Sequence, residues 1–194
     1  LRPIVLLVLG VQVQGMKNLP RKGPAIIVAN HNSHLDTVVL MSLWPLSRLR
    51  QLRPIAAADY FLSNKWLAWF SLNIMNIVSI DRKGEDKERD PLGIMAEVLA
   101  QGEIIIIFPE GSRGMPEEMG RFKSGISRLA QRHPEAPIVP IFMHGLGKSL
   151  PKGDFLLVPF FCDVFIGDLI YWAGSVEATM AAYEDSMNQL AKQR

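Results

Sequence analysis

Short apolar runs recur along the chain, separated by polar turns and by segments in which apolar residues follow helical spacing. The runs predict strands at residues 25–29, 54–57, 77–80, 103–108 and 137–143, with one or two more within 155–166. Helices are expected at residues 33–43, 60–72, 91–100, 123–132 and 175–193. Strands that alternate with helices typically form a parallel sheet covered on both faces. We therefore predict an α/β fold, with a mostly parallel mixed sheet flanked by helices on both faces.

The chain has 194 residues, enough for one domain with a sizeable core. Neither repeats nor an interdomain linker are evident, so we predict a single domain over residues 1–194. Within it, residues 1–14 are a candidate membrane-contacting apolar segment, and 175–193 form a C-terminal amphipathic helix. The run at 4–9 is too short to span a bilayer alone, and a strand, an interfacial segment and the end of a longer anchor stay open.

Composition narrows the functional classes. Hydrophobic residues make up 48% of the chain and mean hydropathy is +0.14. The net charge of +2 does not indicate nucleic-acid binding. Because Cys162 is the single cysteine, an internal disulfide and a cysteine-rich metal site are excluded. We expect Cys162 to be a buried, inert thiol.

The first expected strand runs into the polar sequence NHNSHLD at residues 30–36. Five residues along a helix leave two side chains roughly 140° apart, and an odd separation along a strand puts them on opposite faces. His31 and Asp36 can touch only if Asp36 lies in the first turn of the next helix, with Ser33 as its N-cap. An imidazole held by a carboxylate is the base of a catalytic triad. His34 is a competing base, and Asp36 as a helix cap alone is the structural alternative.

Three more polar stretches follow expected strands or open a helix. Arg82 leaves the strand at 77–80, and the sequence FPEGSRG follows the strand at 103–108. Its glycines allow a ligand to approach the backbone, and its arginine offers a planar fork for phosphate. Lys123 opens a helix whose N-terminus favours an anion. Each of these polar stretches could instead be an ordinary solvated surface group. Taken together, they indicate a base beside a phosphate clamp.

These motifs resemble the glycerolipid acyltransferase family, whose best-known members are 1-acylglycerol-3-phosphate acyltransferases. The resemblance rests on His31-x4-Asp36, on FPEGSR at residues 108–113 and on VPI at 139–141, in the family's order, and it covers residues 15–170. One departure concerns the block that ends at Arg82. The family usually has a glycine five residues before this arginine and an aromatic residue three before it, where this chain has Ile77 and Ser79.

The resemblance implies a role for each matching residue. His31 would be the catalytic base, paired with Asp36. Acceptor binding would fall to Arg82, Glu110, Gly111, Ser112, Arg113 and Lys123, and the acyl donor or chain would lie near Val139 and Pro140.

An alcohol can attack an activated acyl thioester directly, so neither an acyl-enzyme nor a metal is required. We expect no cofactor, with acyl-CoA or acyl carrier protein as co-substrate. Backbone N–H groups near Asn32, Ser33 or Gly111 are candidates to bind the oxyanion. The acceptor expected is lysophosphatidic acid, with glycerol 3-phosphate or another lysolipid as alternatives. A non-catalytic lipid-binding module and a thioesterase or lipase are rival functions, although no Gly-x-Ser-x-Gly elbow is present.

An amphiphilic acceptor implies contact with a membrane surface. We expect four interfacial elements: the apolar start, the basic residues Lys17, Arg21 and Lys22, the basic cluster at 48–53 and the aromatic segment 66–70. A core helix is the alternative for 66–70. We expect the chain on the cytoplasmic face of a membrane, peripheral or with an N-terminal anchor, and without a nucleic-acid partner.

Overall fold

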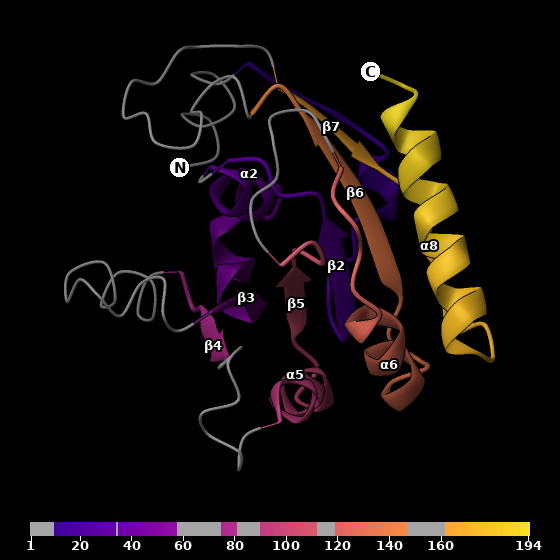
Figure 1. Cartoon of the computed structure of the whole chain (residues 1–194). Coiled ribbons are helices and arrows are strands. Elements are labelled where there is room, and N and C mark those ends of the chain that lie inside the picture. Colours follow the sequence, from indigo (N-terminus) through magenta and orange to yellow (C-terminus); the bar gives the residue numbers. More distant parts are fainter. Residues whose placement is uncertain (1–9, 34, 58–74, 81–89, 112–118, 147–161) are drawn as a thin grey trace.

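The isoleucine- and valine-rich runs form the centre of a seven-stranded sheet, ordered β1-β7-β6-β2-β5-β3-β4. The structure is a computed structural model and describes residues 10–33, 35–57, 75–80, 90–111, 119–146 and 162–194 (Figure 1). Its strands are β1 Val11–Gln14, β2 Ala25–Ala29, β3 Leu52–Ala57, β4 Val78–Ile80, β5 Ile104–Ile107, β6 Ile138–His144 and β7 Cys162–Ile166. Its α-helices are α2 Asp36–Ser42, α5 Pro91–Ala100, α6 Gly125–Arg132 and α8 Val176–Ala191.

Five strands, β6, β2, β5, β3 and β4, run parallel to one another. Strand β7 is antiparallel to β6, and the edge strand β1 is parallel to β7. The mostly parallel mixed sheet predicted from the sequence is therefore confirmed. Because β2 lies between β5 and β6, the loop that follows β2 emerges at the centre of the sheet.

Both faces of the sheet are covered, as expected. Alternate residues of β2 point to opposite faces: Ala25 and Ile27 pack in the core beneath α2, whereas Ile26 and Val28 face the other helices. Helices α5, α6 and α8 contribute to this second core through residues such as Leu99, Leu129, Tyr183 and Met187. In Figure 1, α8 lies on the right of the central strands and α2 on the left.

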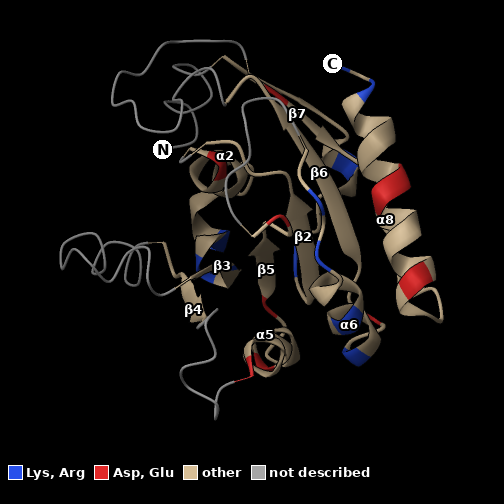
Figure 2. Cartoon of the chain, in the orientation of Figure 1, with Lys and Arg blue, Asp and Glu red and all other residues tan. Residues whose placement is uncertain are grey.

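Charged residues lie mainly outside these two cores. Figure 2 shows acidic residues along α8 and basic residues on α6. Exposed acids on α8 include Glu184 and Asp185, and exposed bases on α6 include Arg128 and Arg132. Cys162 is fully buried, as expected.

Helix α2 begins at Asp36, three residues later than the sequence predicts. The Asp36 carboxylate accepts hydrogen bonds from the backbone N–H groups of Asn32 and Ser33, at 2.7 and 2.9 Å, which keeps these two residues outside the helix. The Ser33 N–H bond is one half of the expected capping box. The Ser33 hydroxyl accepts instead from the N–H of Leu35, at 3.3 Å, and the residue preceding the helix is Leu35, without a side-chain cap.

Three elements were not predicted: strand β1 and the 3-10 helices η1 Met16–Asn18 and η2 Leu46–Gln51. The apolar run at 4–9, the helix at 60–72 with its aromatic segment 66–70, and residues 155–161 lie outside the described residues. Of the helices that the structure describes, none has the length and apolar character needed to cross a bilayer.

Candidate active site

The candidate site lies where the neighbouring parallel strands β2 and β5 end. Val28 is paired with Ile107, so the loop after Ala29 and the segment 108–111 leave the sheet side by side. Ligands of open α/β sheets bind in this position, outside the carboxyl ends of the strands. Sequence segments about 80 residues apart thus meet at one edge.

His31 and Asp36 are in direct contact. Nδ1 of His31 lies 2.8 Å from Oδ2 of Asp36, and the same oxygen accepts the two backbone bonds from Asn32 and Ser33. Asp36 is 1% exposed and His31 is 21% exposed at the side chain. The buried carboxylate therefore fixes the ring from inside, while the imidazole stays open to solvent. Oδ1 of Asp36 has no hydrogen-bond partner within the described part of the chain.

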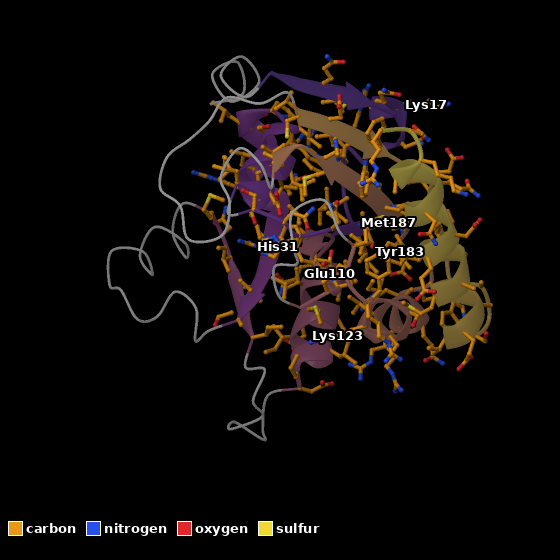
Figure 3. All side chains as sticks on the ribbon, turned by 45° about the horizontal axis from the view of Figure 1, so that its top comes forward. Lys17, His31, Glu110, Lys123, Tyr183 and Met187 are labelled. Carbon is orange, nitrogen blue, oxygen red and sulfur yellow. The ribbon has the colours of Figure 1, made fainter. Side chains whose placement is uncertain are left out.

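Two residues of the segment 108–111 hold His31 from the other side. The Phe108 ring stacks on the imidazole, with ring centroids 4.2 Å apart and planes inclined by 22°. Oε1 of Glu110 accepts the backbone N–H of His31 at 3.0 Å, and Oε2 accepts the N–H of Gly120 at 3.2 Å. Figure 3 shows His31 and Glu110 next to each other. Burial raises the pKa of Glu110, and the two backbone bonds partly oppose this.

Lys123 is brought to the same loop. Its backbone N–H donates to the carbonyl of Pro109 at 3.1 Å, and its Nζ lies so close to Gly111 that a Cβ there would be 2.5 Å away. Gly111 also has φ of +76°, which disfavours other residues. The structure therefore places an ammonium group beside the glycine that follows Glu110.

Helix α8 supports the segment that carries Lys123. The ring of Tyr183 meets Phe122 edge-on, with centroids 5.0 Å apart. The Tyr183 hydroxyl is buried and has no hydrogen-bond partner among the described residues. Burial, with a smaller contribution from the charge of Glu110, raises the pKa of Tyr183 well above its ordinary value. Tyr183 therefore packs against the segment that carries Lys123 from the core side.

Asn30 joins the loop that follows β2 and carries His31 to the neighbouring strand β6. Its Nδ2 donates to the carbonyl of Met143 at 2.9 Å, and its Oδ1 accepts the Met143 N–H at 2.7 Å. This pair of side-chain bonds holds the start of the loop after β2 against β6. Sequence reasoning missed Asn30, Phe108 and Gly120. Phe108 carried a signal as the first residue of the FPEGSR block, and Asn30 as the first residue of NHNSHLD, whereas Gly120 carried none.

Other predicted site residues fall into two groups. Val139 and Pro140 are buried in the middle of β6, where Val139 packs in the core beneath α2 and Pro140 faces Gly167. The assignment of these two residues to the acyl donor stays a prediction. Four residues lie outside the described part of the chain: His34, Arg82, Ser112 and Arg113.

The N–H groups expected to bind an oxyanion are already engaged. Those of Asn32 and Ser33 donate to Asp36, and that of Gly111 donates to the carbonyl of Phe108 at 3.1 Å. These bonds shape the two loops. We therefore do not assign the oxyanion to these groups.

Comparison with known proteins defines the class. The sequence model of the family described as Acyltransferase matches residues 10–144, a range that contains both loops of the site. The chain belongs to this acyltransferase family.

Individual relatives have more specific names. The chain is 31% identical over 145 residues to the chloroplastic 1-acyl-sn-glycerol-3-phosphate acyltransferase LPAT1 of Arabidopsis thaliana, covering 74% of the chain and 38% of that protein. It is 29% identical over 183 residues to the 1-acyl-sn-glycerol-3-phosphate acyltransferase of Pseudomonas aeruginosa, covering 93% and 65%. Against the human alpha enzyme of that name, identity is 32% over 137 residues, covering 69% and 45%. The chain thus spans less than two thirds of the length of each.

A solved structure has the same fold. The crystal structure of the 1-acyl-sn-glycerophosphate (LPA) acyltransferase PlsC from Thermotoga maritima superposes with a TM-score of 0.76 at 22% identity, covering 94% of this chain and 71% of that one. At this identity the similarity establishes the fold alone.

Proposed function

We propose that the chain transfers a fatty acyl group from an acyl thioester to the hydroxyl of lysophosphatidic acid, giving phosphatidic acid. The donor would be acyl-CoA or acyl carrier protein. The contact of 2.8 Å between His31 and Asp36, at the carboxyl edge of the sheet, is the observation that carries the proposal. The names of the relatives support this acceptor.

His31 acts as the base through Nε2, because Nδ1 is held by Asp36, a tautomer assigned from the hydrogen-bond pattern. Nε2 takes the proton from the acceptor hydroxyl as its oxygen forms a bond with the thioester carbonyl carbon. The C–S bond then breaks, and the imidazolium returns its proton to the leaving thiolate. Asp36 stabilises the imidazolium, and the stacked Phe108 ring favours the same charge.

The acceptor phosphate is held by cations near FPEGSR. Lys123 beside Gly111 supports this assignment, and the family resemblance adds Arg82 and Arg113. An arginine can bind phosphate through two parallel hydrogen bonds, so the hydroxyl arrives oriented toward His31.

We also propose contact with the cytoplasmic face of a membrane, peripherally or through an N-terminal anchor. Exposed Arg21, Lys22 and Arg50 support this contact, as does Leu46, which is 60% exposed. Trp44 joins these two regions by donating its indole N–H to the carbonyl of Pro20 at 2.8 Å. Arg53 pairs with Glu103 instead, with 2.7 Å between Nη2 and Oε1. Sedimentation with anionic vesicles tests this surface, and unchanged binding after its charges are removed would contradict it.

Acyl transfer from palmitoyl and oleoyl thioesters of coenzyme A and of acyl carrier protein to lysophosphatidic acid tests the function. We expect His31→Ala to lower kcat by about 10²–10⁴-fold and Arg113→Ala to raise KM for the acceptor about tenfold to a hundredfold. The matched controls are His133→Ala and Arg128→Ala. Thiol release without acceptor would favour a thioesterase. Transfer only to glycerol 3-phosphate or another lysolipid would change the acceptor, and full activity of His31→Ala would overturn the mechanism.

A further inference from the structure

Glu110 connects two loops of the site through their backbones. Its Oε1 accepts the N–H of His31 at 3.0 Å, and its Oε2 accepts the N–H of Gly120 at 3.2 Å. His31 and Gly120 lie on opposite sides of Glu110 in the sequence, 79 residues before it and 10 residues after it. Each carboxylate oxygen is therefore already used by the protein itself, before any acceptor is bound.

Both partners of Glu110 are donors, which explains why an acid is needed here. A carboxylate offers an acceptor on each oxygen, whereas a glutamine would turn its NH₂ group toward one of the two N–H groups. An N–H group that faces an NH₂ group in place of a carboxylate oxygen loses this hydrogen bond. The geometry thus distinguishes glutamate from its amide, although the two side chains have the same shape.

The charge of Glu110 is held at a cost in stability. Burial raises the pKa of Glu110 above its ordinary value, and the charge of Asp36 adds a smaller rise. The backbone bonds from His31 and Gly120 and the charge of His31 lower the pKa in part. The titratable groups near Glu110 are His31 in the loop after β2, Asp36 at the start of α2 and Lys123 beside Gly111. The hydroxyl of Tyr183, on the core side, also interacts with the charge of Glu110. With a folded pKa above the unfolded one, folding stability falls as the pH rises through the interval between them.

Gly120 fits against the same carboxylate. A Cβ at Gly120 would lie 2.9 Å from Oε2 and 3.3 Å from Cγ of Glu110. A larger residue would therefore displace the side chain that accepts the His31 N–H. This close approach gives a second way to disturb Glu110 without replacing it.

We propose that Glu110 is a positioning residue, which sets the backbone of His31 against the segment 119–123 while Asp36 and Phe108 set its ring. This role replaces the acceptor contact that the family resemblance implies. As a statement about catalysis, it rests on the proposed function. The bridge itself can be tested without any substrate.

Amide NMR of the whole chain measures the bridge directly. We expect the His31 and Gly120 amide protons to shift together with pH, with one shared midpoint above the ordinary pKa of a glutamate, and Glu110→Gln to abolish both shifts. Independent midpoints, or titrations that survive Glu110→Gln, would overturn the proposal. These outcomes do not depend on which acceptor the enzyme uses, so failure of the proposed function is seen separately in the transfer assay.

Kinetics measures the consequence. We expect Glu110→Gln to lower kcat by about 10–100-fold, as a small misplacement of a catalytic group does, with KM for lysophosphatidic acid changed by less than about threefold. Gly120→Ala should lower kcat in the same way, and the double variant should be no worse than Glu110→Gln alone. Glu97→Gln, on the exposed side of α5, is the matched control. A raised KM with unchanged kcat would show instead that Glu110 binds the acceptor.

Discussion

Asp36 uses its two oxygens very differently. Oδ2 accepts from His31 and from two backbone N–H groups, whereas Oδ1 is buried without a partner among the described residues. The carboxylate thus shapes the loop and orients the base through the same atom. An amide in the same orientation could keep the three bonds to oxygen and place its nitrogen where Oδ1 lies.

Asp36→Asn should therefore preserve the fold and remove the negative charge. We expect kcat for acyl transfer to fall by about 10²–10⁴-fold, because the imidazolium that forms at His31 loses its counter-charge. Thermal unfolding checks that the variant is folded, and Asp185→Asn on α8 is the control. A kcat within about threefold of the parent would show that Asp36 only shapes the loop before α2.

The described helices begin in different ways. Helix α5 has Asp90 as its N-cap, accepting from the N–H groups of Leu92 and Gly93 at 3.0 and 3.1 Å, followed by Pro91. Helix α8 has Ser175, whose hydroxyl accepts the Ala178 N–H at 3.0 Å. Helix α2 has no side-chain cap, and the carboxylate of its first residue, Asp36, contacts His31. The loop that carries His31 therefore precedes a helix without a side-chain cap.

Ser175→Ala should destabilise the protein by about 1 kcal/mol, because the Ala178 N–H loses its acceptor. Urea denaturation measures the change in the free energy of unfolding. Ser175→Asp supplies another good cap and a favourable charge at the helix start, so it should restore the loss. Equal destabilisation by both substitutions would show that the hydroxyl serves something other than the cap.

The strength of each local signal decided which elements the sequence could predict. The isoleucine run of β5 and the Pro91–Ala100 helix were located within a residue or two. Strand β1 alternates valine with exposed glutamine and is held at the sheet edge by β7, some 150 residues away, so its own four residues say little. An apolar run also carries no direction, and the antiparallel course of β7 could not be read from it.

The same distinction holds within the site. The His31–Asp36 contact follows from a spacing of five residues and one turn, so it could be predicted. The Glu110 bridge and the Phe108 stack join segments nearly 80 residues apart, which only the pairing of β2 with β5 brings together. Sequence reasoning therefore predicted the contact of His31 with Asp36 but not the contacts of His31 with Phe108 and Glu110.

Three exposed basic residues lie near the amino ends of two strands of the sheet. The exposed Arg21, Lys22 and Arg50 precede β2 and β3, toward the edge opposite the one where His31 emerges. Loss of these charges should therefore weaken membrane binding while leaving the chemistry intact.

Replacing all three with serine should weaken binding to anionic vesicles by about fivefold per residue. Turnover of a short-chain, water-soluble lysophosphatidic acid should be unchanged. Co-sedimentation with phosphatidylglycerol vesicles measures the binding, and Arg128→Ser with Lys192→Ser, on the other face, is the control. Equal binding by the triple variant and the parent would place the membrane contact elsewhere on the chain.

His31 contacts Asp36, five residues away, and Phe108 and Glu110, nearly 80 residues away. These two separations imply an order in which the contacts form during synthesis. A growing chain that has reached residue 100 already contains His31 and Asp36, and their loop can close locally. It lacks β5, and with it the aromatic ring over the imidazole and the carboxylate behind it. The full set of contacts around His31 therefore forms only when β5 docks beside β2, so the site is completed by the sheet and not by its own loop.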